Sequence, residues 1–417
     1  MLKQLFIVSL ITVFILNTVN LYPADTLVLG GLIIEATHNN PEILAAKKRY
    51  EASVVRVPQA KSLDNPTIGL EFEKIPRGTL KLNKVEPDDR MLSITQMFPF
   101  FGKLPLKGKI ALVESQMAAS EYKNKELEVI NEVKNAYYDL FMVYKEIELN
   151  EESKSFLENI ARIADSKYVV GDVMQEDIFK INLEIAKLSN DIINLREEKK
   201  AKESRLNTLL NREPENPLGI PVLEKEAAFE ADINYLYKLT LENQPELLTF
   251  AYAITKNKHA KALAKKSFFP DMMAGIVQRG VTSGTIGPWD LMLAFSVPLW
   301  FWTKQRYEVK EAIANLEEAE AAYQAMKNKA FRETKDLAVK VEISRNKINL
   351  YNNSQIPILE SSIASSLSSY KGAKGDIMMI LDNIRMLIET KMDYYKALVA
   401  YNMNLADLEK QVGVNLR

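Results

Sequence analysis

Hydrophobic and polar residues alternate in short runs at three places along the chain, residues 67–73, 92–95 and 291–296. A fourth run, residues 271–277, fits the pattern less well because both of its sides carry apolar residues. Alternation with period two is typical of a β-strand that has one apolar and one polar face. The sequence therefore predicts two strand hairpins, over residues 67–98 and 271–297.

Long charged stretches rich in Ala, Leu, Glu and Lys follow each predicted hairpin, and they are broken at Gly171-Asp172 and at Gly375-Asp376. A helix of 60 residues is about 90 Å long, so such helices must pack side by side in coiled-coil fashion. They form two predicted helical hairpins, 106–210 and 305–411. Shorter helices are expected from Pro41 and Pro245, because proline suits the first turn of a helix. The predicted long helices are 106–168, 177–210, 305–370 and 376–411.

The order of these elements occurs twice. Asn40-Pro41-Glu42 is matched by Gln244-Pro245-Glu246, which places Pro245 204 positions after Pro41, and Pro66 and Pro270 keep the same spacing. Internal repetition determines the architecture. We predict a first repeat over 25–211, a linker over 212–231 whose prolines prevent a continuous helix, and a second repeat over 232–417.

The N-terminus is typical of an exported protein. Lys3 precedes an apolar run from Leu5 to Leu16, and Pro23-Ala24-Asp25 follows. This pattern predicts a secretory signal peptide over residues 1–24. An uncleaved membrane anchor is the alternative, but the run of about 12 residues is shorter than the ~20 that span a bilayer. The chain has no cysteine, so it has neither a disulfide nor a lipid-anchor cysteine.

The composition gives no sign of a catalytic, metal-binding or nucleic-acid-binding site. The net charge of −1 does not indicate nucleic-acid binding, and the two histidines, His38 and His259, belong to no cluster with metal-ligand or catalytic spacing. We therefore expect no enzyme activity, no cofactor and no metal site. Methionines such as Met378 and Met379 are compatible with soft-metal contact, although at such spacing they are more often packing residues.

The strands have two interpretations. A soluble, half-buried hairpin gives the same alternation, and taken alone it is the more common source. Export, the long helical stretch between the hairpins and the lack of other strands favour insertion in a membrane. Four strands cannot close a barrel, and an open sheet edge cannot sit in lipid. Several chains are then needed, and three would supply 12 strands, a size known for membrane barrels.

This topology assigns faces to the strand residues. Aromatic residues at the strand ends that join helices would form one interfacial belt. The residues expected to face lipid are Ile68, Leu70, Phe72, Leu92, Ile94, Leu291, Leu293 and Phe295. Those expected to face the lumen are Thr67, Gly69, Glu71, Ser93, Thr95, Ala294 and Ser296. The expected belt comprises Phe98, Phe100, Phe101, Phe268, Phe269, Trp300, Phe301 and Trp302.

Four motifs recur at matching places in the two repeats or close them. They are Leu381-Asp382-Asn383 with the helix through Tyr394-Tyr395 and Leu408-Glu409, Leu206-Asn207-Thr208 through Pro214, Gln96-Met97-Phe98-Pro99 and Ser296-Val297-Pro298-Leu299. Together they resemble the motifs of TolC-type outer-membrane efflux proteins. Phe101-Gly102-Lys103 is in addition similar to the outer-membrane components of heavy-metal exporters.

The resemblance implies a mainly α fold with a small transmembrane β part. Three chains would form a 12-stranded barrel in the outer membrane and a long α-helical barrel in the periplasm, with the linker in an equatorial belt. It implies a passive homotrimeric duct that works with a periplasmic adaptor protein and an inner-membrane pump to export drugs, metal ions or other toxic compounds. The alternative function is an exported coiled-coil structural or adhesion protein, which would need no alternating strands with aromatic ends.

The resemblance also implies two functional regions at the far end of the helices. Asp382 matches an aspartate that rings the periplasmic entrance, and Tyr370 matches a tyrosine that holds it shut. The chain departs from the family pattern at Met379, where a second aspartate is frequent, and at Gly375, where an arginine is frequent, which favours a weaker or more apolar latch. Asp382 is equally compatible with a solvated residue near a turn. The hairpin tips expected to dock the adaptor are Gly171, Asp172, Gly375 and Asp376.

Overall fold

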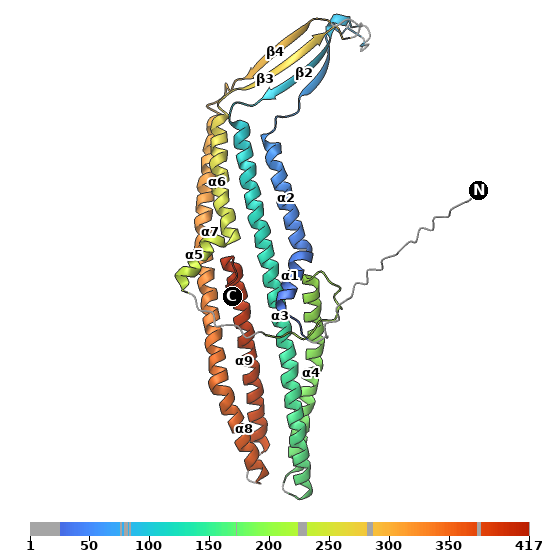
Figure 1. The fold of residues 1–417 in the computed structure, drawn as a ribbon, viewed down its shortest axis with the longest axis vertical. Coiled ribbons are helices and arrows are strands. Elements are labelled where there is room, and N and C mark those ends of the chain that lie inside the picture. Colours follow the sequence, from blue (N-terminus) through green and yellow to red (C-terminus); the bar gives the residue numbers. More distant parts are fainter. Residues whose placement is uncertain are drawn as a thin grey trace, which may run out of the picture.

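The computed structural model describes residues 26–75, 77, 78, 82, 85–171, 173–223, 232–281, 287–372 and 377–416. The molecule is elongated, with a small β-sheet at one end and long helices running away from it (Figure 1). The predicted signal peptide lies outside the described residues, as do Asp172, Gly375 and Asp376. The predicted fold class, mainly helical with a small antiparallel sheet, is confirmed.

Each repeat contributes two short helices, two strands and a pair of long helical arms. The first contains α1 (Leu29–Asn39), α2 (Pro41–Lys61), β1 (Thr67–Phe72), the 3-10 turn η2 (Pro87–Asp89), β2 (Arg90–Phe98), α3 (Lys103–Val169) and α4 (Gln175–Leu209). The second contains α5 (Ile233–Asn243), α6 (Pro245–Lys266), β3 (Asp271–Arg279), β4 (Trp289–Ser296), α7 (Gln305–Leu350), the π-helical segment η3 (Tyr351–Gln355), α8 (Ile356–Lys371) and α9 (Ile377–Val412).

Helices α1 and α5 begin each repeat and were not predicted. Both have 11 residues, and they begin at positions 29 and 233, which is again a spacing of 204. Asn40 and Gln244, each with extended backbone, separate them from α2 and α6. A residue before proline is pushed out of the helical region, which explains both breaks. The Asn40 side chain then caps α2 by accepting hydrogen bonds from the Glu42 and Ile43 amides.

Two helices, α3 and α7, run through both halves of the molecule (Figure 1). Helix α3 has 67 residues, about 100 Å at 1.5 Å per residue, and it packs on α2 and α6 near the sheet and on α4 and α9 farther away. The second arm was predicted as one helix to Tyr370, but the π-helical segment at residues 351–355 interrupts it. Pro357 follows at once, and a proline ring clashes with the carbonyl four residues earlier, so a wider turn forms there.

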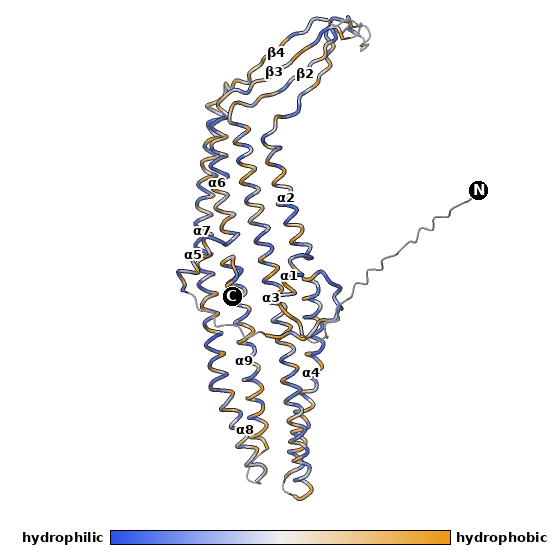
Figure 2. Tube along the Cα trace, in the orientation of Figure 1, coloured by the Kyte–Doolittle hydropathy of each residue, from blue (hydrophilic) through white to orange (hydrophobic). Residues whose placement is uncertain are grey.

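The four strands form one antiparallel sheet in chain order, β1-β2-β3-β4. The two repeats meet at the β2–β3 pair, where Ile94 lies opposite Ile276 and Ser93 opposite Val277. β3 is thus the full nine-residue strand that its weak alternation only partly indicated. No described helix is long and apolar enough to cross a membrane. Accordingly, hydrophilic residues recur along every long helix in Figure 2.

Among the residues that the structure describes, the buried core lies in three clusters along the helices. One joins α1, α3 and α4 at mid-height, one holds the far ends of α3, α4, α8 and α9 together, and one joins α5, α7 and α9. The linker is fixed to the first of these. The buried Tyr137 hydroxyl lies 2.8 Å from the Leu27 carbonyl oxygen and accepts a hydrogen bond from the Val222 amide at 2.9 Å.

Candidate functional site

One face of the sheet is apolar and exposed. Ile68, Ile94, Ile276 and Leu291 lie directly opposite one another across all four strands, and their exposed fractions are 68%, 49%, 48% and 69%. Residues directly opposite in antiparallel strands project to the same face. The register therefore places all eight residues that were expected to face lipid on this side, and it adds Ile276, Met272 and Trp289, which the sequence pattern had not singled out.

The opposite face carries the residues expected to line the lumen. Gly69, Ser93 and Val277 share one row, and Thr67, Thr95 and Gly275 share another. Gly275 has no room for a side chain, since an added Cβ would lie 2.7 Å from Thr95 Cγ2. Methionines and Val277 also lie on this face, so it is less polar than the alternating pattern predicted; the methionines are Met91, Met97, Met273 and Met292.

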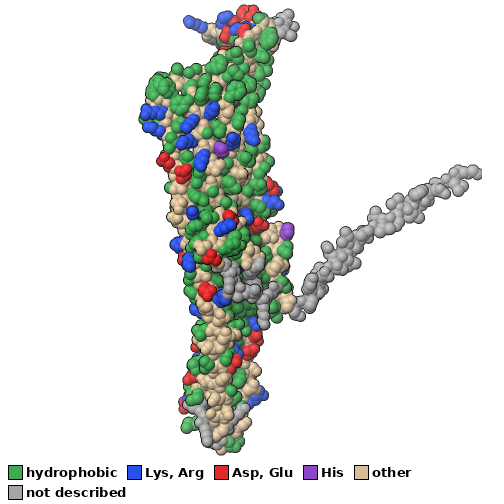
Figure 3. Space-filling view, turned by 60° about the vertical axis from the view of Figure 1, so that its left-hand side comes forward, with side chains coloured by type: hydrophobic (Ala, Val, Ile, Leu, Met, Phe, Trp, Pro, Cys, Tyr) green, Lys and Arg blue, Asp and Glu red, His purple; other side chains and the backbone are tan. Residues whose placement is uncertain are grey.

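Aromatic side chains gather where the strands join the helices. Phe100 and Phe269, one from each repeat, stack with ring centroids 4.5 Å apart, and Phe301 and Trp302 meet edge to face at 5.0 Å. Asp271 at the start of β3 accepts a hydrogen bond from the Phe100 amide and pairs with Lys103 at 2.7 Å. The two repeats are thereby joined at this level, where Figure 3 shows a broad hydrophobic surface.

The three residues expected at the entrance do not form one cluster within the chain. Tyr370 is buried among the apolar residues that join α3, α4, α8 and α9, whereas Met379 and Asp382 are exposed on α9. Lys167 of α3 donates to the Tyr370 carbonyl at 2.8 Å and lies over the Tyr370 ring. Burial, with a smaller contribution from Asp177, raises the pKa of Tyr370. Tyr370 thus joins the two helical hairpins.

Arg385 provides a second connection that the sequence interpretation missed. It lies 3.4 Å from the Asp382 carboxylate on its own helix and 3.5 Å from Glu184 of α4. The three-residue spacing of Asp382 and Arg385 is a standard helical ion-pair spacing and was available in the sequence. The contact with Glu184 of α4 could not be read from the sequence, because it depends on how two helices distant in the sequence pack together.

The described residues around the tip of the first helical hairpin include large, exposed apolar side chains. Gly171, with φ of +82°, follows the end of α3, and Val169, Val170 and Met174 around it are 84%, 70% and 73% exposed. The sequence interpretation named the glycine and missed these apolar neighbours. An exposed group of large apolar side chains is typical of a protein interaction site.

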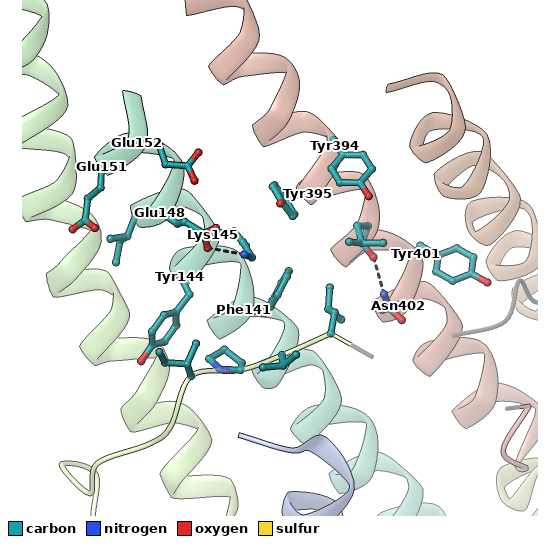
Figure 4. Close-up of a pocket in the computed structure, with 16 residues that line it drawn as sticks. Phe141, Tyr144, Lys145, Glu148, Glu151, Glu152, Tyr394, Tyr395, Tyr401 and Asn402 are labelled. Carbon is teal, nitrogen blue, oxygen red and sulfur yellow. Dashed lines mark hydrogen bonds and ion pairs between the residues drawn. The ribbon is translucent and has the colours of Figure 1, made fainter. Parts of the chain in front are cut away.

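A cavity of about 950 Å³ lies at mid-height between α3, α9 and the linker (Figure 4). Its wall carries Phe141 and Tyr395, and Lys145 lies over both rings at 5.9 and 5.6 Å while pairing with Glu148 at 2.6 Å. The chain's own lysine therefore already covers this aromatic wall. Within the described residues, no group of three or more His, Cys, Asp or Glu could hold a metal ion.

Comparison with known proteins shows which sequences and folds this chain resembles. Residues 32–212 match the family model described as outer membrane efflux protein. A Haemophilus influenzae protein described as uncharacterized is 21% identical over 319 residues, covering 72% of this chain and 68% of that protein.

Solved channel structures have the same fold. The outer membrane protein VceC of Vibrio cholerae is 16% identical, covers 93% of this chain and 97% of its own, and has a TM-score of 0.77. CusC, described as forming a transmembrane channel, is 14% identical with a TM-score of 0.79 over 93% and 92% of the two chains. The first repeat thus matches the family model of outer membrane efflux proteins, and the fold is that of these solved structures over nearly the whole chain.

Proposed function

We propose that three copies of this chain form one continuous duct, through which a partner pump exports small toxic compounds or metal ions. The observation that carries this proposal is the sheet. It has one exposed apolar face and two edge strands, β1 and β4, that each pair with only one strand among the described residues. Open edges are costly in lipid, and joining β4 of one copy to β1 of the next closes them. Three copies give 12 strands.

The apolar side of the sheet then contacts lipid, and the other side lines the passage. The aromatic residues at the strand–helix junction lie at the membrane interface on the periplasmic side, where such rings are enriched. The helices extend from there into the periplasm. A structural or adhesion protein would have no need for an exposed apolar sheet, and this observation disfavours that alternative.

The far ends of the helical hairpins are the proposed docking site for a periplasmic adaptor protein. Val169, Val170 and Met174 supply an exposed apolar surface at the turn after α3. A duct has no energy source of its own, so an inner-membrane pump joined through this adaptor must drive transport. Asp172, Gly375 and Asp376 belong to the same proposed docking region.

The entrance is proposed to narrow near Asp382. Three symmetry-related carboxylates around a narrow axis would attract cations and repel one another. Arg385 offsets part of this charge, and its bond to Glu184 of α4 connects the ring to the neighbouring helical hairpin. With Met379 exposed beside Asp382 and Tyr370 buried, the latch of this entrance is more apolar than an Arg/Tyr/Asp network.

Membrane fractionation and single-channel recording test the proposal together. The chain, expressed with its N-terminus intact, should enter the outer membrane, migrate as a detergent-resistant trimer that dissociates on heating, and conduct ions in planar bilayers. A monomer that stays in the periplasm and gives no conductance would contradict the duct.

A further inference from the structure

Two helix ends at the strand–helix junction carry lysines and no acids. Residues 90–113, which run from β2 into the start of α3, and residues 247–270, which comprise most of α6 and the turn after it, contain no Asp or Glu. The first stretch includes Lys103, Lys107 and Lys109, and the second includes Lys256, Lys258, Lys261, Lys265 and Lys266. Because α3 packs against α6, these lysines lie on neighbouring helices at the end of the molecule next to the sheet.

Most of these lysines have no ion-pair partner within the described part of the chain. Lys103 is engaged by Asp271, whereas Lys107, Lys109, Lys258, Lys261 and Lys265 have no carboxylate within 4.0 Å. Lys61 of α2 adds another positive charge, since its side chain lies across Gly108 of α3. Two carboxylates also lie at the junction, Asp271, which pairs with Lys103, and Glu308 of α7, which accepts a hydrogen bond from the Ser267 hydroxyl. The other lysines therefore give the junction a local excess of positive charge in a chain whose net charge is −1.

The lysines begin at the aromatic residues and extend away from the sheet. Lys266 Nζ lies 5.5 Å from the Phe100 ring centroid and 5.4 Å from that of Phe269. Lys261 is five residues earlier in α6, about 8 Å along the helix axis. The headgroup region of a bilayer is about 5–8 Å thick on each side, and lysine stems reach several ångströms toward it. Figure 3 shows Lys and Arg side chains directly below the hydrophobic surface.

We propose that these lysines, the basic collar, bind the phosphates of anionic phospholipids in the periplasmic leaflet of the outer membrane. The collar is defined as Lys107, Lys109, Lys258, Lys261, Lys265 and Lys266. The aromatic rings fix the depth of the chain in the bilayer, and the collar then lies opposite the headgroups. A free phosphate lacks the acyl chains that place a headgroup beside the rings. The inference rests on the proposed duct, because that orientation places the junction at the periplasmic leaflet.

The test compares two triple variants of the detergent-solubilised trimer. The collar variant is Lys258→Gln/Lys261→Gln/Lys265→Gln, which leaves the ring contacts of Lys266 intact. The matched control is Lys335→Gln/Lys340→Gln/Lys347→Gln, which removes the same charge from exposed positions on α7 far from the sheet. Each protein is titrated with phosphatidylglycerol, phosphatidylcholine or glycerol phosphate, and binding is followed by native mass spectrometry and the thermal unfolding midpoint.

Native protein and the control should bind phosphatidylglycerol more tightly than phosphatidylcholine and gain thermal stability from it. The collar variant should bind phosphatidylglycerol at least about tenfold more weakly, since one lysine near an anionic surface changes affinity about fivefold. Equal binding of both lipids by native protein, an unchanged preference in the collar variant, or an equal response to glycerol phosphate would overturn the proposal.

Two further measurements distinguish failure of the lipid-binding proposal from failure of the proposed duct and from failure of the variant to assemble. Channel conductance of the collar variant should equal that of native protein, so loss of lipid preference with intact conductance isolates the collar from the duct. If the triple variant does not assemble, the comparison of lipids on native protein and on Lys107→Gln/Lys109→Gln decides the matter.

Discussion

Leu293 and Ala294 are neighbours in β4 that project to opposite faces of the sheet. Leu293→Arg places a charge on the apolar face and should destabilise the membrane-inserted protein by about 2–4 kcal/mol. Ala294→Arg, on the proposed lumen face, should cost less than about 1 kcal/mol. Urea unfolding from lipid vesicles measures both. Equal tolerance of arginine at the two positions would contradict the assignment of faces.

Alanine substitutions at Asp382 and at Arg385 should change the block of the channel by multivalent cations in opposite directions. Asp382→Ala removes the proposed ring and should weaken block by multivalent cations, by roughly fivefold if about 1 kcal/mol of attraction is lost. Arg385→Ala removes the cation beside Asp382, while Glu184 keeps its pairing with Lys187, and the substitution should strengthen the block. Single-channel recording measures both constants. Unaltered selectivity and block in Asp382→Ala would leave Asp382 as a solvated helix residue.

At the scale of single residues, the sequence predicted which face of the sheet a strand residue occupies better than it predicted which distant residue a side chain contacts. The alternation of Ile68, Leu70 and Phe72 is a local property of the strand, and the register places all three on one side. The burial of Tyr370 depends on Lys167 and other residues some 200 positions away, so no local pattern contains it. The ion pair between Arg385 and Glu184 was not predicted for the same reason, because it joins two residues that are far apart in the sequence.

Gly171 allows the chain to turn at the end of α3. Its φ of +82° lies in the left-handed region, and nothing lies within 4 Å of the position of an added Cβ. Gly171→Ala should therefore cost about 1–2 kcal/mol through the backbone alone. Gly31 in α1 also has nothing within 4 Å of an added Cβ, but its backbone is that of an ordinary helix. Gly31→Ala should therefore be neutral or stabilising. Thermal unfolding midpoints that fall equally in both variants would refute this explanation.

The tip of the first helical hairpin should contact the adaptor. Because the chain has no cysteine, Val170→Cys introduces a single attachment point for a photoactivated cross-linker. Asn216→Cys in the described part of the linker is the matched control. We expect adaptor capture from position 170 and little from position 216, detected by mass spectrometry of the cross-linked band. Capture only from the linker would exclude this docking site.

At the scale of elements, the sequence predicted the long helices and both hairpins but not the short helices. Helices α1 and α5 have only 11 residues each, and the clearest repeat motif begins after them, at Pro41 and Pro245. The π-helical segment at residues 351–355 arises from one proline inside a helix that packing maintains on both sides. Neither feature changes the hydrophobic pattern on which the prediction of long helices depended.

In the proposed duct, the molecule needs neighbouring copies because its sheet ends in two open edge strands. The apolar face and the aromatic junction explain insertion in a membrane, and the long helices explain the reach away from it. The described chain alone encloses no passage, since its four strands form an open sheet. The proposed duct therefore depends on the pairing of β4 in one copy with β1 in the next.

Disulfide formation between these edge strands tests that pairing most directly. Thr67→Cys in β1 is combined in turn with Asp290→Cys, Met292→Cys or Ala294→Cys in β4, all on the proposed lumen face. Ser93→Cys with Val277→Cys is the control, because these residues lie opposite each other within one chain and should cross-link only internally. After oxidation in outer membranes, at least one β1–β4 pair should give covalent dimers and trimers and no larger species. Internal bonds or monomers alone from every β1–β4 pair, while the control pair oxidises, would contradict the trimeric duct.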